Sequence, residues 1–152
     1  MKILGEKGLG SLLKIILKIA FVLIIALMII IPIICVITKI GFHPGIYILY
    51  PAAVFFLVIV KQFIGLFHSL ETNTPFSENT VKRLKKSMIG SIGICIYGFI
   101  ITIFAICIKS FEAAFAYGVA CILFFGVSIA LYILAELFNQ AKDFKEENDL
   151  TI

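Results

Sequence analysis

The chain has 152 residues, of which 62% are hydrophobic and only 14% are charged. So few polar residues cannot cover the surface of a water-soluble domain of this length, which excludes an ordinary soluble protein. The formal net charge is +4, and the basic residues flank apolar stretches instead of forming one folded basic face. We therefore expect no direct binding of nucleic acid.

Four stretches contain no Asp, Glu, Lys or Arg, namely residues 19–37, 40–60, 87–108 and 113–135. Each is close to the roughly 20 residues that an α-helix needs to cross a bilayer core. These long runs lack the alternation of barrel strands, so the fold class is all-α. We predict a polytopic membrane protein with a single domain of two antiparallel helical hairpins. Its spans cover about residues 15–38, 46–67, 87–108 and 113–138.

The basic residues lie mainly on one side of the predicted spans. The N-terminal segment and the connection between the second and third spans carry four Lys or Arg residues each, whereas Lys39 and Lys109 lie on the other side. The positive-inside rule then places both termini and the middle connection in the cytoplasm. The lipid bilayer is the first expected partner.

Small residues at helical spacing predict close packing between the third and fourth spans. Small side chains at i and i+4 let two backbones approach closely in lipid, where van der Waals contact drives association. On the third span these residues are Ser87, Gly90, Ser91, Gly93, Cys95 and Gly98, and on the fourth they are Ala114 with Gly118 and Gly126 with Ala130.

No pattern in the chain indicates catalysis or metal binding. The four cysteines lie within or at the edge of spans, without CxxC or Cys/His spacing, which favours small apolar fillers at helix contacts. GxSxG, HExxH and Walker A patterns are absent, and His43 and His68 fall on opposite membrane faces. We expect a protein that is not an enzyme and that has no cofactor or metal.

Two charged residues interrupt the spans near their cytoplasmic ends. Lys61 lies about two turns before the end of the second span, and Glu136 lies close to the end of the fourth. A charge in lipid is costly unless it is paired, so their opposite signs and similar depth predict an ion pair. The alternative is that each side chain extends separately to the headgroups.

The middle connection predicts a helix that begins outside the membrane. Pro75 disfavours helical geometry at the residue before it, and Ser77 can cap a helix that continues into the third span. This helix has an apolar face and a basic face, which is typical of a segment lying against headgroups. The other interpretation is a docking surface with Phe76 as its apolar anchor.

The C-terminal segment extends the fourth span beyond the membrane. A helical period continues from Glu136 to about residue 147, and the alternation of Leu150 and Ile152 with polar residues predicts an extended end. Residues 69–86 and 139–152 together form a predicted cytoplasmic surface, here named the platform. The candidate partner-binding residues of the platform are Phe76, Lys82, Arg83, Lys86, Asp149, Leu150 and Ile152.

Two stretches, TPFSENTVKRLKKS and AELFNQAKDFKEENDLTI, carry a family resemblance. The chain resembles, over essentially its whole length, a bacterial family of four-span integral membrane proteins of unknown function, with a Thr-Pro-Phe cytoplasmic loop and a Glu-x-Asp-Leu-Thr-Ile C-terminus. Asn73 departs from the family, whose members often have Gly there. The matching positions are Thr74, Pro75, Phe76, Leu84, Lys85, Glu147, Asp149, Leu150, Thr151 and Ile152.

The resemblance implies a location in the bacterial cytoplasmic membrane and no known activity. It also implies a partner, because such proteins are often encoded beside a small helix-turn-helix DNA-binding protein. The first functional hypothesis is that the platform binds and sequesters this transcription regulator. The alternative is a bundle, possible also as a homo-oligomer, that binds or transports a small molecule. Its site would include Tyr47, Tyr50, Lys61, Gln62, Tyr97 and Glu136.

Overall fold

A computed structural model describes residues 9–38, 44–72 and 76–150 of the chain. These residues form α1 (Leu9–Ile37), α2 (Pro44–Glu71), α3 (Glu78–Cys107) and α4 (Phe111–Leu150), and the described ranges contain no strand. All 4 helices are long and apolar enough to cross a membrane. The predicted all-α polytopic fold is therefore confirmed.

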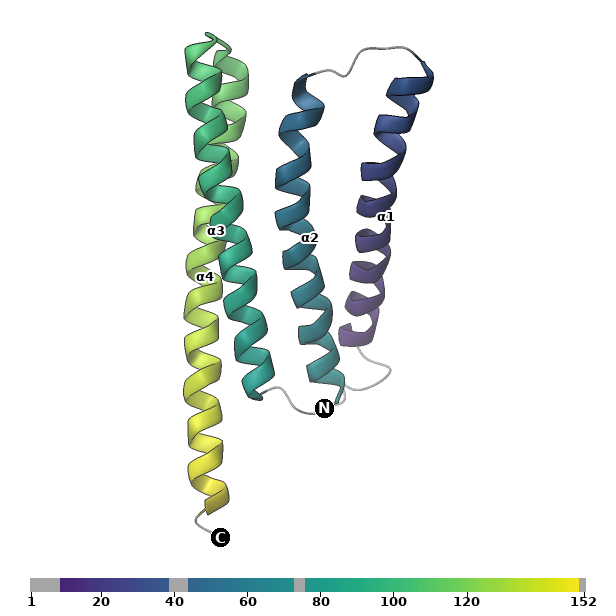
Figure 1. Ribbon diagram of the computed structural model, residues 1–152. Helices are drawn as coiled ribbons and strands as arrows, with labels where there is room; N and C mark the ends of the chain where they lie inside the picture. The colour runs from purple at the N-terminus through teal and green to yellow at the C-terminus, as the bar shows by residue number, and fades with distance from the viewer. Residues whose placement is uncertain (1–8, 39–43, 73–75, 151–152) are drawn as a thin grey trace.

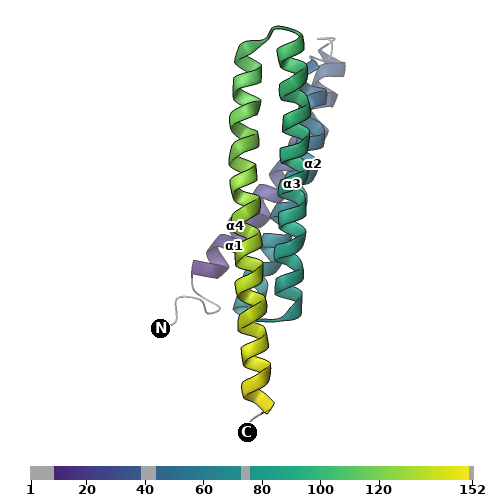
Figure 2. The ribbon, with the colours of Figure 1, turned by 90° about the vertical axis from the view of Figure 1, so that its left-hand side faces the viewer.

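The helices stand side by side in chain order and run in alternating directions (Figure 1). α4 packs along α3, α3 along α2, and α2 along α1, while among the described residues α1 has no other helix as its packing neighbour. Figure 2 shows α1 inclined to α3 and α4. We name the end where α1 begins and α4 ends the terminal end, and the end with the α3–α4 turn the hairpin end. The arrangement is an open row of helices.

The start of α3 confirms the predicted cap. Ser77 has extended backbone angles (φ −98°, ψ 154°), and its Oγ accepts a hydrogen bond of 3.3 Å from the Thr80 backbone N–H. This bond satisfies one of the amides that a helix N-terminus leaves without a partner. At the other end of α3, Lys109 adopts a left-handed conformation (φ 59°) and turns the chain into α4.

The contact between α3 and α4 consists largely of small side chains. On α3 the buried positions Leu84, Ser87, Ser91 and Ile94 follow alternating spacings of three and four residues, as in a left-handed coiled coil. Ser91 Oγ donates a hydrogen bond of 2.9 Å to the Phe124 carbonyl of α4. The small-residue contact predicted for the third and fourth spans is thus present in the structure.

Two parts of that prediction are wrong. Gly90 and Gly93 face α2, because the groups nearest their Cβ positions belong to Ile59 and Phe55. Gly126 has no other group within 4 Å of its Cβ position, and Ala130 is exposed. The predicted pair Ala114 and Gly118 does lie on the packed side of α4, where Cys121, Leu131 and Ala135 follow it. Small residues are tolerated on the lipid side of a membrane helix as well, so their spacing alone does not identify the contact face.

α4 is the longest helix and projects beyond its neighbours at the terminal end (Figure 1). Its 40 residues correspond to a length of about 60 Å, roughly twice the thickness of a bilayer core. The prediction of an extended end after residue 147 is wrong for residues 148–150, because α4 remains helical to Leu150. Ile152 lies outside the described residues. Helix continuation keeps the backbone hydrogen bonds within the segment.

Candidate functional site

The terminal end contains an ionic contact between the first two helices. Lys14 on α1 donates a hydrogen bond to the carboxylate of Glu71, the last residue of α2. His68 lies beside this pair, with its Nδ1 3.2 Å from Lys14 Nζ and 3.6 Å from Glu71 Oε2. Glu71 lies outside the uncharged stretches, and the hydrogen bond from Lys14 lowers the pKa of its carboxyl. This contact fastens α1 to α2.

This cluster of Lys14, His68 and Glu71 was not predicted from the sequence. A signal was present, because residues at i and i+3 lie on the same side of a helix, which places His68 beside Glu71. The position of Lys14 along α1 relative to α2 depends on tertiary packing and has no sequence signal.

Arg83, one of the candidate partner-binding residues, extends from α3 to α2. A Cβ atom at Gly65 on α2 would lie only 1.7 Å from Arg83 Nη1, so the guanidinium rests directly on the backbone of α2. The Arg83 side chain is half-buried as a result. Gly65 has no side chain and therefore leaves the space that this contact needs.

The two lysines beside Arg83 remain on the surface. Lys82 is exposed and forms an ion pair of 2.6 Å with Glu78, one helical turn earlier. This hydrogen bond lowers the pKa of the Glu78 carboxyl. Lys86 is exposed too, so Lys82 and Lys86 are placed to meet headgroups or a partner.

Phe76 brings the middle connection against α4. Its ring centroid is 5.4 Å from that of Phe138, at an interplanar angle of 48°. Phe138 in turn packs on the core cluster, which includes Leu84 and Leu131. Phe76 is still 43% exposed, so one part of this predicted anchor stabilises the platform and the other part remains accessible.

The projecting part of α4 presents apolar side chains without cover in the described structure. Leu137 is 56% exposed and Phe144 is 65% exposed. Of the C-terminal candidates, Asp149 and Leu150 lie in the last turn of α4, and Ile152 lies outside the described residues. The contact between Phe76 and Phe138 places the middle connection next to the base of this projecting part.

The structure does not bring Lys61 and Glu136 together. Both side chains are exposed, and none of the ion pairs among the described residues joins them. The reason is the order of the helices, since α3 is the packing neighbour of both α2 and α4. Separate extension to the headgroups, the alternative in the sequence analysis, agrees with this exposure.

Two of the three tyrosines proposed for a small-molecule site, Tyr50 and Tyr97, form hydrogen bonds between helices. Tyr50 donates a hydrogen bond to the Met28 carbonyl of α1, and Tyr97 donates one of 2.8 Å to the Ile48 carbonyl of α2. These bonds connect neighbouring helices within the apolar region. The Tyr47 side chain lies outside the described residues.

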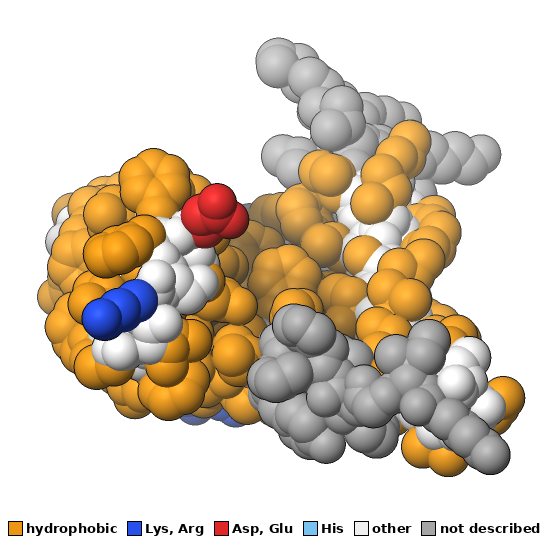
Figure 3. Space-filling model, turned by 90° about the horizontal axis from the view of Figure 1, so that it is seen from above, with side chains coloured by type: hydrophobic (Ala, Val, Ile, Leu, Met, Phe, Trp, Pro, Cys, Tyr) orange, Lys and Arg blue, Asp and Glu red, His pale blue; other side chains and the backbone are white. Residues whose placement is uncertain are grey.

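The two ends of the molecule differ in polarity. The described surface at the hairpin end is mostly hydrophobic, with few charged side chains (Figure 3). The terminal end carries the ion pairs of Lys14 with Glu71 and of Lys82 with Glu78. In the described part of the chain, no group of three or more His, Cys, Asp or Glu residues is placed to hold a metal ion.

Comparisons with known proteins give a family and no function. Neither the curated proteins nor the solved structures contain a match to this chain. One family profile matches residues 15–152, and it is described as "Protein of unknown function (DUF2975)". This range includes all of α2, α3 and α4 and most of α1. The chain, a multi-pass membrane protein by its helices, belongs to the DUF2975 family.

Proposed function

We propose that this protein is a non-enzymatic regulatory protein of the bacterial cytoplasmic membrane. In this proposal, its platform binds a small cytoplasmic helix-turn-helix regulator and keeps it from DNA. The observation that carries the proposal is the projecting part of α4. Residues 136–150 continue the helix by about 22 Å beyond its uncharged stretch, far enough to meet a protein outside the headgroups.

The side chains of the projection suit a protein partner. Phe144 is 65% exposed, and an aromatic side chain on a helix is a common anchor in the groove of another protein. The acidic residues of the projection, Glu136, Asp143, Glu146, Glu147 and Asp149, outnumber its two lysines, Lys142 and Lys145. The DNA-binding face of a regulator is basic, so an acidic helix can bind that face in competition with DNA phosphates.

The distribution of basic residues supports a cytoplasmic location of the platform. Lys82, Arg83, Lys85 and Lys86 all lie in the first turns of α3, at the terminal end. Basic residues close to spans are retained on the cytoplasmic side. The platform would then face the compartment that contains transcription regulators.

Photocrosslinking in living cells tests this proposal. A photoreactive amino acid replaces Phe144 in one variant and Phe115 in a control variant. Phe115 is also strongly exposed, at 76%, but lies near the hairpin end. We expect a small DNA-binding protein crosslinked at position 144 and not at 115, identified by mass spectrometry.

A second readout tests the regulatory consequence. Phe144→Ser in the full chain should release the captured regulator and change the expression of its target genes at least severalfold. If the targets respond equally to the native chain and to a Phe144→Ser chain that accumulates normally, the proposal is wrong. A crosslinked protein without DNA-binding activity contradicts it as well.

A further inference from the structure

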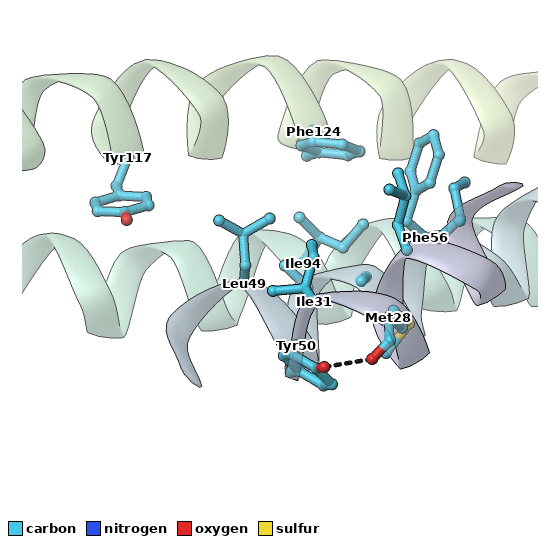
Figure 4. A pocket seen from close by; sticks show the side chains of 12 residues that line it. Met28, Ile31, Leu49, Tyr50, Phe56, Ile94, Tyr117 and Phe124 are labelled. Carbon is cyan, nitrogen blue, oxygen red and sulfur yellow. Dashed lines mark hydrogen bonds between the residues drawn. The ribbon is translucent and has the colours of Figure 1, made fainter. Parts of the chain in front are cut away.

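An apolar cavity of about 580 Å³ lies between α1 and the α3–α4 pair, with α2 along one side (Figure 4). Its volume falls in the range of small-molecule binding sites. Its lining side chains come from all four helices and include Ile31 of α1, Ala53 of α2, Ile94 of α3 and Tyr117 of α4. Because α1 packs on α2 alone among the described helices, this cavity, here named the slot, faces the surrounding lipid between α1 and α4.

The slot runs parallel to the helices. It extends over residues 24–31 of α1, 49–56 of α2 and 117–124 of α4. Each range covers about 10 Å of helix. In each helix the end nearer the hairpin end is the one with Ile31, Leu49 or Tyr117. The slot therefore has the direction of a lipid acyl chain.

The polar groups of the slot are few. None of its lining residues is charged, which disfavours a charged group inside it. The Tyr50 hydroxyl is already bonded to the Met28 carbonyl, as Figure 4 shows. The Tyr117 hydroxyl forms no hydrogen bond with any residue that the structure describes. It is available as a donor to a ligand.

The depth of Tyr117 indicates which acceptor it meets. It lies four residues inside the uncharged stretch that begins at residue 113, about 6 Å along the helix. Its ring reaches from α4 toward the other lining side chains in Figure 4. The ester carbonyls of glycerolipids lie at this boundary of the hydrocarbon core, where tyrosine is commonly found.

We propose that the slot binds one glycerolipid of the bilayer leaflet at the hairpin end. One acyl chain lies along α2 between Leu49 and Phe56, and an ester carbonyl oxygen accepts a hydrogen bond from Tyr117. The acyl chain supplies the van der Waals contacts that an empty apolar cavity loses. This site is at the opposite end from the platform and does not depend on the proposed function.

The test uses the full chain in liposomes that contain a phosphatidylglycerol with a diazirine on its acyl chain. After irradiation, peptide mapping locates the label, and unlabelled phosphatidylglycerol competes for the site. We expect saturable labelling at residues 24–31, 49–56 and 117–124. Ala53→Phe fills the slot and should lower this labelling about tenfold.

Two further variants separate a site from general lipid contact. Ala116→Phe adds the same side chain at an exposed position beside Tyr117 and should leave the labelling unchanged. Tyr117→Phe keeps the ring and removes the hydroxyl, and should weaken competition by the unlabelled lipid about 2- to 10-fold. Tyr117→Phe removes a hydroxyl that forms no hydrogen bond within the described structure, so this variant should fold. It therefore tests the site even if Ala53→Phe does not fold.

Three outcomes would overturn the proposal. One is labelling spread over all helices and insensitive to both slot variants, which means annular lipid only. Another is equal competition by an alkane without an ester carbonyl, which removes the role of Tyr117. The third is equal loss of labelling in Ala53→Phe and Ala116→Phe.

Discussion

Lys14 and Glu71 provide a residue-scale test of how α1 is held. A carboxyl whose pKa is lowered in the folded chain stabilises the fold fully above its unfolded pKa of about 4.3. That stabilisation is lost as the pH falls through the folded pKa. The pKa of Glu71 is lowered by Lys14, so this carboxyl follows that rule. We predict that the native chain melts at a higher temperature than Glu71→Gln above about pH 5.

The difference in melting temperature should shrink as the pH falls below about 4. Thermal unfolding in mild detergent over this pH range measures it. His68 lies beside the same carboxylate, so both chains should carry His68→Gln, which removes the titration of the imidazole. A difference that stays constant down to about pH 3 would show that the Glu71 charge does not stabilise the fold.

At the scale of elements, the contact between α3 and α4 depends on side-chain size. Ser91 has 0% of its surface exposed and donates its hydroxyl to the Phe124 carbonyl. Ser91→Leu should lower the free energy of unfolding by about 1–3 kcal/mol, because the larger side chain overfills the contact. Ser91→Ala removes one interhelical hydrogen bond and should cost only about 0.6 kcal/mol.

Unfolding in a denaturing detergent measures these differences. Ile89→Leu is the matched control on the same helix, since Ile89 is 62% exposed and should tolerate the exchange. If Ser91→Leu and Ile89→Leu have the same free energy of unfolding, the contact between α3 and α4 does not depend on side-chain size.

The sequence predicts the helices well and their faces poorly. Helix number and the Ser77 cap follow from local rules, namely span length and N-terminal hydrogen bonding. The faces do not follow, because lipid and protein interior are equally apolar, so hydrophobicity does not distinguish a contact residue from a lipid-facing one. Gly126 was misplaced for this reason. The slot also depends on packing, since its residues come from every helix.

At the scale of the whole molecule, α3 and α4 form the best-packed unit and α1 the least-packed one. The buried residues Ser87 and Leu84 lie on α3, and Ala135 lies on α4. In the most apolar stretch of α1, by contrast, 0% of the residues are buried. Such a gradient of packing gives a gradient of local stability. We expect α1 to separate from α2 more readily than α4 separates from α3.

The Tyr50 hydroxyl bonded to the Met28 carbonyl is one of the few polar contacts that hold α1. Tyr50→Phe removes this bond, so we predict faster deuterium exchange in α1 around Met28 and unchanged exchange in α3 and α4. Hydrogen exchange with mass spectrometry in lipid nanodiscs measures both. Tyr132→Phe is the control, because Tyr132 is 58% exposed on α4. Equal acceleration in all four helices would mean that they open as one cooperative unit. That result would contradict the inferred gradient of local stability from α1 to the α3–α4 pair.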